Sequence, residues 1–169
     1  MNEIKYYYFA YGGNTNNNHM SRSYPNHKIY SLGILNDYKL VFRKSLNNLN
    51  LENAYCDIDY QENKSVYGII YELSLDDINK LDDQEYNGIL YKRILVDIHI
   101  FNNQIIQCHT EKRYNVSNQI DLRCYTYIMI NKDMPYSKPN DRYYKVVIDG
   151  YNYHKLPLSQ VYNAINEII

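Results

Sequence analysis

A glycine pair at the end of an aromatic run is the first feature of this sequence that could do chemistry. Residues 9–14 read FAYGGN and close a run, from residue 4 to residue 11, that is apolar enough to be a buried strand. Glycine supplies positive φ angles and lets a ligand approach the backbone closely. Backbone N–H groups gathered in such a turn, ahead of a helix, suit a carboxylate or an oxyanion. The same residues also make an ordinary turn, so the pattern alone leaves both interpretations open.

An acidic cluster supplies the second candidate group. Its members are Asp76, Asp77, Asp82, Asp83 and Glu85. A solvated helix face and loop would explain such a cluster. Glu85 differs because apolar side chains flank it on both sides, from Leu81 to Leu90. An acid among apolar residues can have its pKa raised toward neutrality, which general acid–base catalysis requires. Glu85 is therefore the candidate proton carrier, whereas Asp82 and Asp83 are expected to be structural or exposed.

Other familiar catalytic groups are not arranged for chemistry. The five histidines are scattered, and none stands at a metal-ligand spacing from Cys, Asp or Glu, so no metal is expected. The sequence has no GxSxG nucleophile elbow, and the glycine pair lacks the context of a phosphate-binding loop. Cys56, Cys108 and Cys124 are an odd number without a CxxC pair. They are expected to be reduced thiols in a cytoplasmic compartment.

Composition argues against several classes of function. The 169 residues are expected to form a single domain, residues 1–169, with a core that needs no disulfide or metal. The formal net charge is −1, so no whole-chain field favours nucleic acid or an anionic membrane. Apolar runs are far shorter than a bilayer span, and no signal-peptide pattern is expected at the N-terminus. The 22 tyrosines could stack on single-stranded nucleic acid only beside a basic groove, and Lys and Arg are not clustered.

The elements that must position these groups follow from periodicity and turn residues. Strands are expected over residues 4–11, 28–35, 38–43, 54–60, 65–73, 90–100, 105–109 and 122–131, and helices over 14–22, 141–149 and 158–169. A further short helix, capped by Ser74, should end just before Glu85. Residues 36–37 and 61–64 are expected to be hairpin turns, and 44–53 a surface loop. Six to eight hairpin-connected strands with three or four short helices predict an α+β fold with a mixed or antiparallel, partly barrel-like sheet.

Taken together, the motifs resemble those of the gamma-glutamylcyclotransferase family, with its AIG2-like fold. The resemblance is carried by FAYGGN at 9–14 (Phe-Ala-Tyr-Gly-Ser-Asn in the family), VYGIIY at 66–71, LDDQE at 81–85, CYTY at 124–127, and Tyr143, Gly150 and Leu156-Pro157. Each motif is short, but their order and spacing extend over nearly the whole chain. The last residue of LDDQE matches the glutamate that is the acid/base of the family.

The resemblance implies an enzyme that needs no cofactor. The α-amine of a γ-glutamyl group attacks its own side-chain amide carbonyl, which releases 5-oxoproline and a free amine, and proximity makes a protein nucleophile unnecessary. Glu85 is implied to carry the proton. The residues implied to bind the substrate are Tyr11, Gly12, Gly13, Asn14, Tyr91, Tyr127 and Tyr143. Any of these tyrosines is equally well explained as plain core.

Two departures from the family pattern keep an alternative open. Gly13 stands where the family has Ser, which is expected to loosen the loop, and Tyr86 stands where Gly is frequent, which is expected to reshape the pocket mouth. The alternative is a non-catalytic member of the same fold that binds a small molecule or a protein. The residues leave open whether the substrate is a dipeptide, a γ-glutamylamine or glutathione, and whether the chain forms a homodimer. The interpretation requires that Glu85 face a pocket whose floor is the glycine turn.

Overall fold

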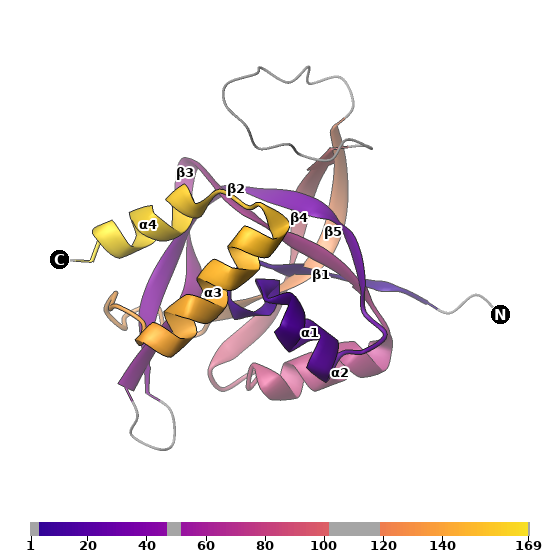
Figure 1. The fold of residues 1–169 in the computed structure, drawn as a ribbon, viewed down its shortest axis with the longest axis horizontal. Helices are drawn as coiled ribbons and strands as arrows, with labels where there is room; N and C mark the ends of the chain where they lie inside the picture. Colours follow the sequence, from indigo (N-terminus) through magenta and orange to yellow (C-terminus); the bar gives the residue numbers. More distant parts are fainter. Residues whose placement is uncertain (1–3, 47–51, 102–118, 169) are drawn as a thin grey trace.

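A closed five-stranded barrel forms the body of the protein in the computed structural model, which describes residues 4–46, 52–101 and 119–168 (Figure 1). The strands are β1 (Tyr6–Ala10), β2 (Lys28–Leu46), β3 (Glu52–Leu73), β4 (Tyr91–Phe101) and β5 (Gln119–Met129). They close in the order β1-β3-β2-β4-β5. All neighbours pair antiparallel except β1 and β5, which are parallel where Tyr8 pairs with Tyr125. The predicted α+β fold with a mixed, barrel-like sheet is confirmed.

Short helices pack on the barrel, and three of those described begin at a polar side chain that caps them. A 3-10 turn, η1 (Gly13–Thr15), and α1 (Asn17–Ser23) follow β1, and α2 (Leu75–Gln84) links β3 to β4. The last two helices are α3 (Asp141–His154) and α4 (Leu158–Asn166). Asn16 caps α1, Ser74 caps α2 and Asn140 caps α3, each through a side-chain oxygen that accepts backbone N–H groups. Figure 1 shows α1 and α3 on the same side of the barrel.

Two of the predicted hairpin turns are wrong, because β2 and β3 each run straight through them. Their pairing extends from Lys28 opposite Glu72 to Leu46 opposite Glu52, with a register shift between Asn36 and Tyr38. At the expected turns, Asp37 has φ 61° and Asn63 has φ 62°. The Asn63 N–H donates to Asp37 Oδ1 at 3.0 Å. Residues typical of tight turns here form a bulge, which bends a hairpin without reversing the chain.

Other boundaries differ in smaller ways. The described residues contain five strands rather than six to eight, and the predicted strand at 105–109 lies outside them, as does Cys108. The predicted helix at 141–149 continues to His154. On α4, Tyr162 is 47% exposed, whereas Val161 and Ala164 are buried and form its packed side. Cys56 and Cys124 are both free and buried. Among the helices described, none has the length and apolar character needed to cross a bilayer.

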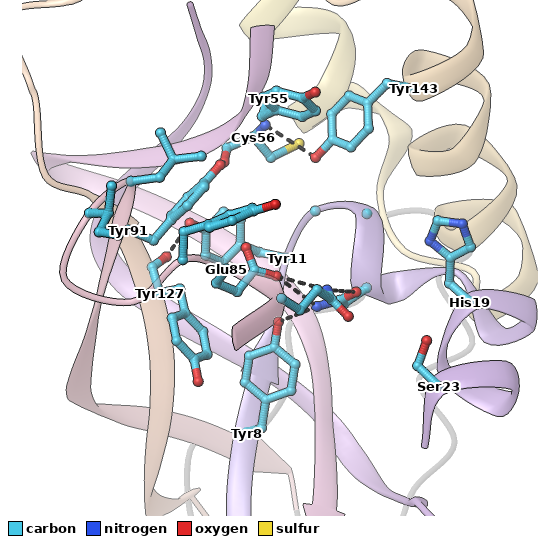
Figure 2. Close-up of a pocket in the computed structure, with 17 residues that line it drawn as sticks. Tyr8, Tyr11, His19, Ser23, Tyr55, Cys56, Glu85, Tyr91, Tyr127 and Tyr143 are labelled. Carbon is cyan, nitrogen blue, oxygen red and sulfur yellow. Dashed lines mark hydrogen bonds between the residues drawn. The ribbon is translucent and has the colours of Figure 1, made fainter. Parts of the chain in front are cut away.

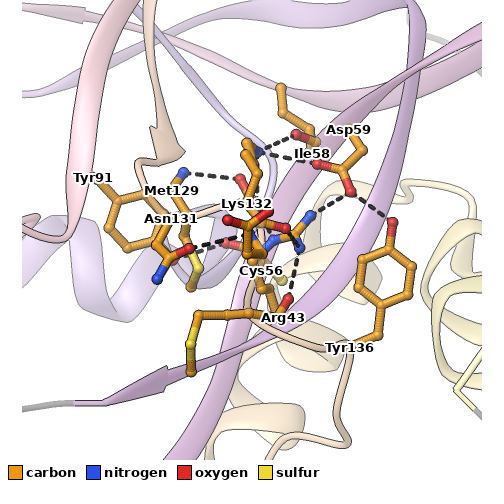
Figure 3. Close-up of polar contacts among 12 residues, drawn as sticks. Arg43, Cys56, Ile58, Asp59, Tyr91, Met129, Asn131, Lys132 and Tyr136 are labelled. Atoms are coloured by element: carbon orange, nitrogen blue, oxygen red, sulfur yellow. Dashed lines mark hydrogen bonds and ion pairs between the residues drawn. The ribbon is translucent and has the colours of Figure 1, made fainter.

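A buried charge network ties the segment after β5 to the β2–β3 hairpin (Figure 3). Arg43 and Asp57 are 3% and 0% exposed, and Arg43 Nε donates to Asp57 Oδ2 at 2.8 Å. Arg43 also donates to Asp59 and to the carbonyl groups of Lys132 and Met134. Lys132 Nζ donates to Asp57 Oδ2 at 2.7 Å. Both cations and both anions are therefore paired, as charges at this depth require.

Removing one charge from this network should destabilise the protein severely. Arg43→Leu leaves the Asp57 carboxylate buried with only Lys132 as a cation, and we expect the free energy of unfolding to fall by about 3–5 kcal/mol in urea titrations. The matched control is Arg123→Leu, which breaks an exposed pair with Asp97 at 3.8 Å. It should cost less than about 1 kcal/mol. Equal losses for the two variants would contradict the structural role assigned to the network.

Candidate functional site

The glycine turn has side-chain donors on its carbonyl groups, and its first N–H groups have no side-chain cap. The Tyr151 hydroxyl donates to Tyr11 O at 2.7 Å, Tyr71 donates to Asn14 O at 3.0 Å, and Thr15 Oγ1 donates to Gly12 O at 2.7 Å. No side chain caps η1, which starts at Gly13. The first N–H groups of a helix have no acceptor within it. The turn therefore offers backbone donors beside a pocket that Gly12, Gly13 and Asn14 line.

Close packing, rather than a positive φ, explains both glycines. Gly12 has φ −122°, and Gly88 is the one glycine of the described residues with a positive φ, so the expectation of positive φ at this turn is wrong. A Cβ on Gly12 would lie 2.6 Å from the Cβ of Cys56, and a Cβ on Gly13 would lie 3.1 Å from Cε2 of Tyr143. The Tyr143 ring thus occupies space that a serine at position 13 would need.

Glu85 lies at the end of α2 and is hydrogen-bonded to the glycine turn. Asn14 Nδ2 donates to Glu85 Oε1 at 3.2 Å, and Gln84 Nε2 donates to the same oxygen at 3.0 Å. Gln84 Nε2 also donates to Asn14 Oδ1 at 3.1 Å, which fixes the two amides together. Glu85 Oε2 receives no hydrogen bond from any described residue. Figure 2 shows Glu85 in the middle of the pocket, with Tyr91 and Tyr127 on one side and His19 on the other.

Burial raises the pKa of Glu85 to about 7, although the hydrogen bonds from Gln84 and Asn14 lower it. No Lys or Arg is found among the described residues that line the pocket, so no cation there offsets the loss of water. A carboxyl group with a pKa near neutrality can accept a proton and return it during one reaction. The raised pKa agrees with the expectation for Glu85, although two of its apolar neighbours in the sequence, Tyr86 and Ile89, are themselves 58% and 80% exposed.

The pocket has a volume of about 600 Å³, and every residue predicted for the site lies in its lining. Its lining includes Glu85, Tyr11, Gly12, Gly13, Asn14, Tyr91, Tyr127 and Tyr143. They come from the two residues after β1, from η1, from the end of α2, and from β4, β5 and α3, which are far apart in the sequence. The required juxtaposition of Glu85 and the glycine turn is therefore present.

The four predicted tyrosines contribute their rings to the pocket wall, while their hydroxyls bind protein groups. Tyr11 donates to Tyr127 O, Tyr91 donates to Cys56 O at 2.9 Å, and Tyr127 donates to Asp82 Oδ1 at 2.8 Å. The Tyr143 hydroxyl accepts from the Cys56 N–H at 3.2 Å. Burial raises the pKa of all four. They are neutral wall residues, and Asp82 has the structural role expected of it.

Sequence reasoning missed several residues of the pocket. Those not predicted include Tyr8, His19, Ser23, Tyr55, Cys56 and Gln84. Gln84 could have been found, because it adjoins Glu85 in the LDDQE segment and its amide contacts both Glu85 and Asn14. His19 and Ser23 carry no sequence signal of their own, since they face the pocket only because α1 folds back beside the turn.

Tyr86 has an unusual backbone conformation at the pocket mouth. Its φ is 49°, in the left-handed region, and its side chain is 58% exposed. Non-glycine residues adopt this region at a cost of about 1–2 kcal/mol. The glycine that is frequent at this position in the resembling family would adopt it without that cost.

The chain is similar to one known family and to several solved structures. A model of the AIG2-like family matches residues 65–163. No curated protein matches the chain. A solved structure described as a gamma-glutamyl cyclotransferase superposes with a TM-score of 0.76 and 20% identity, covering 98% of this chain and 89% of its own. An uncharacterized human protein gives a TM-score of 0.75 and 22% identity, covering 99% and 89%.

A more distant structure is described as a yeast gamma-glutamyl cyclotransferase specific to glutathione. Its TM-score is 0.52 at 15% identity, and the alignment covers 96% of this chain and 87% of that one. Identities this low show a shared fold, which agrees with the barrel and helices described above.

The strain at Tyr86 predicts that glycine is a more stable replacement than alanine at this position, which is the reverse of their usual order in a helix. Tyr86→Gly and Tyr86→Ala both remove the ring, but only glycine adopts the positive φ freely, so Tyr86→Gly should be more stable by about 1 kcal/mol in chemical denaturation. At Asn79, an exposed position within α2, the same pair should show alanine more stable than glycine by about 1 kcal/mol. If the glycine and alanine variants showed the same order of stability at Tyr86 and at Asn79, the backbone at Tyr86 would not be strained.

The raised pKa of Glu85 predicts that Glu85→Gln stabilises the protein in a pH-dependent way. The unfolded-state pKa is about 4.3, and the folded-state pKa is about 7. The free energy of unfolding of the wild-type protein therefore falls as the pH rises through this window, because ionising Glu85 costs more in the folded state than in the unfolded state. A neutral Gln does not ionise, so the variant does not lose this stability. The melting temperature of Glu85→Gln relative to wild type should be higher at pH 8 than at pH 4.5. A pH-independent difference would mean that Glu85 is well solvated.

Proposed function

Because the chain belongs to the AIG2-like family, we propose that it is a gamma-glutamylcyclotransferase that forms 5-oxoproline from a γ-glutamyl amide and needs no cofactor. One observation carries the proposal. The carboxyl group of Glu85, with a pKa of about 7, faces the pocket with one unbonded oxygen and is joined through Asn14 to a turn of available N–H groups. A proton carrier and an anion-binding turn therefore share one small cavity.

The reaction needs little more than positioning and proton transfer. The α-amino nitrogen forms a bond to the γ-carbonyl carbon, and the bond from that carbon to the leaving nitrogen breaks. Glu85 Oε2 takes a proton from the α-ammonium group, which makes the amine nucleophilic. The resulting carboxylic acid returns this proton to the leaving nitrogen as the bond from carbon to nitrogen breaks. The attacking nitrogen loses a second proton when the ring amide forms, and this proton leaves with the departing amine, which is released as an ammonium ion. Ring closure is intramolecular, so a bound conformer with the two atoms in contact gains much of the rate from proximity.

The glycine turn would stabilise negative charge during this reaction. The N–H groups of Gly13 and Asn14 are suited to the substrate carboxylate or to the oxyanion that forms as the carbonyl is attacked. The side-chain hydrogen bonds to the carbonyls of the turn hold these donors in place before the substrate arrives. The tyrosine rings of the wall reduce the access of water to the reacting atoms.

The test of this function is release of 5-oxoproline from γ-glutamyl dipeptides, γ-glutamyl-ε-lysine and glutathione. Glu85→Gln keeps the size of the side chain but cannot carry the proton, so the rate should fall by about 100-fold to 10,000-fold. Asp83→Asn is the matched control, because Asp83 is an exposed acid two residues away and does not line the pocket. Its rate should stay within about twofold of wild type.

Two results would count against the proposal. Normal turnover by a folded Glu85→Gln protein would show that another group carries the proton. Absence of 5-oxoproline from every compound, together with tight binding of one of them, would favour a non-catalytic binding protein of the same fold.

For an active protein, kcat/KM should rise with pH through an apparent pKa near 7, because the free carboxylate is the base.

A further inference from the structure

A hydrogen-bonded turn at residues 86–90 holds apolar side chains in water at the mouth of the pocket. Asn87 N donates to Asp82 O at 2.8 Å, Gly88 N to Tyr91 O at 2.7 Å, and Leu90 N to Tyr86 O at 3.0 Å. These bonds fix the backbone. Tyr86 and Ile89 nevertheless remain 58% and 80% exposed, although both line the pocket.

This arrangement leaves apolar surface next to the reacting groups that none of the described residues covers. An exposed isoleucine on its own needs no explanation. Here, however, Tyr86 and Ile89 lie on one turn that starts at the candidate acid and ends at Tyr91, another wall residue. The turn also keeps Tyr86 at a positive φ, and strain of this kind clusters at ligand sites. A ligand that extends from Glu85 toward the mouth would bury both side chains.

The charge around the pocket defines what such a ligand can carry. Glu85 is the one carboxylate in the described lining, and His19 is the one side chain there that can become positive. Lys and Arg, the usual partners of a carboxylate, are not found among the described lining residues. A second carboxylate on the leaving group would therefore enter a pocket that already holds an acid and would lose water without a strong partner.

We propose that the turn 86–90 is a subsite for the leaving group, selective for an amine with an apolar aromatic or aliphatic body and no carboxylate. The inference rests on the proposed function and specifies its substrate class. Tyr86 and Ile89 bind the apolar body and act as specificity-determining residues. His19 and Ser23 of α1 lie across the pocket from Tyr91 and Tyr127 and provide polar groups at the opposite rim (Figure 2).

Three substrates that share the γ-glutamyl group test the subsite. The γ-glutamyl amide of phenethylamine has an apolar body and no carboxylate, γ-glutamylphenylalanine adds only the carboxylate, and γ-glutamylethylamide lacks the ring. We expect kcat/KM for the phenethylamine compound to exceed the value for each of the other two on the order of tenfold or more. The readout is 5-oxoproline released over time.

Variants connect this selectivity to the turn. Ile89→Ser and Tyr86→Gly should each raise KM for the phenethylamine compound and reduce its advantage over γ-glutamylethylamide several-fold. Leu75→Ser is the matched control, because Leu75 is 51% exposed but does not line the pocket, and it should leave the ratio unchanged.

The outcomes separate the two proposals. Equal or better turnover of γ-glutamylphenylalanine, or an unchanged ratio in both turn variants, overturns the subsite while the cyclotransferase activity stands. Failure of all three compounds, of the dipeptides and of glutathione to give 5-oxoproline overturns the activity and the subsite with it.

Discussion

The site depends on one unfavourable placement, a carboxyl group largely removed from water with no Lys or Arg beside it among the described residues. Glu85 is tolerated there because Asn14 and Gln84 donate to one of its oxygens. These amides are held in turn by tyrosines, since Asn14 Nδ2 also donates to the Tyr8 hydroxyl and the Tyr24 hydroxyl donates to Gln84 Oε1. Neutral donors compensate less for burial than an arginine would. The carboxyl group therefore stays near its protonation midpoint at neutral pH.

The barrel makes this placement possible because it brings the end of a strand and the end of a helix together. β1 ends at the glycine turn and α2 ends at Glu85, and the two meet because β1 pairs with β3, the strand that leads into α2. α3 packs on the turn from outside, where a Cβ on Gly150 would lie 2.3 Å from Thr15 Oγ1. The turn is thus enclosed by Cys56 and Tyr143 on one side and by the Gly150 contact on another, which leaves its backbone little freedom.

Local signals in the sequence predicted which residues line the pocket better than they predicted the pairing of the sheet. Glu85, the glycine turn and the Ser74 cap were found because each depends on neighbours in the chain, namely apolar flanks, a strand end and a helix start. The hairpins were predicted wrongly because Asp37 and Asn63 take the same left-handed conformation in a tight turn and in a bulge. Only the partner strand decides between the two. The close contacts of Gly12 and Gly13 were also out of reach, since they involve β3 and α3, which are distant in the sequence.

The buried network around Arg43 has a consequence for how this chain can diverge. Arg43 and Lys132 together neutralise Asp57 and Asp59, so a substitution that removes Arg43 or Asp57, the two buried members, leaves a charge in the interior short of a partner. Replacing all of these residues together by apolar ones would cost little stability. A series of single substitutions, however, passes through variants that fold poorly. Descendants of this sequence should therefore keep the four residues together or lose them together, and a homologue that carries only some of them should have a compensating change nearby.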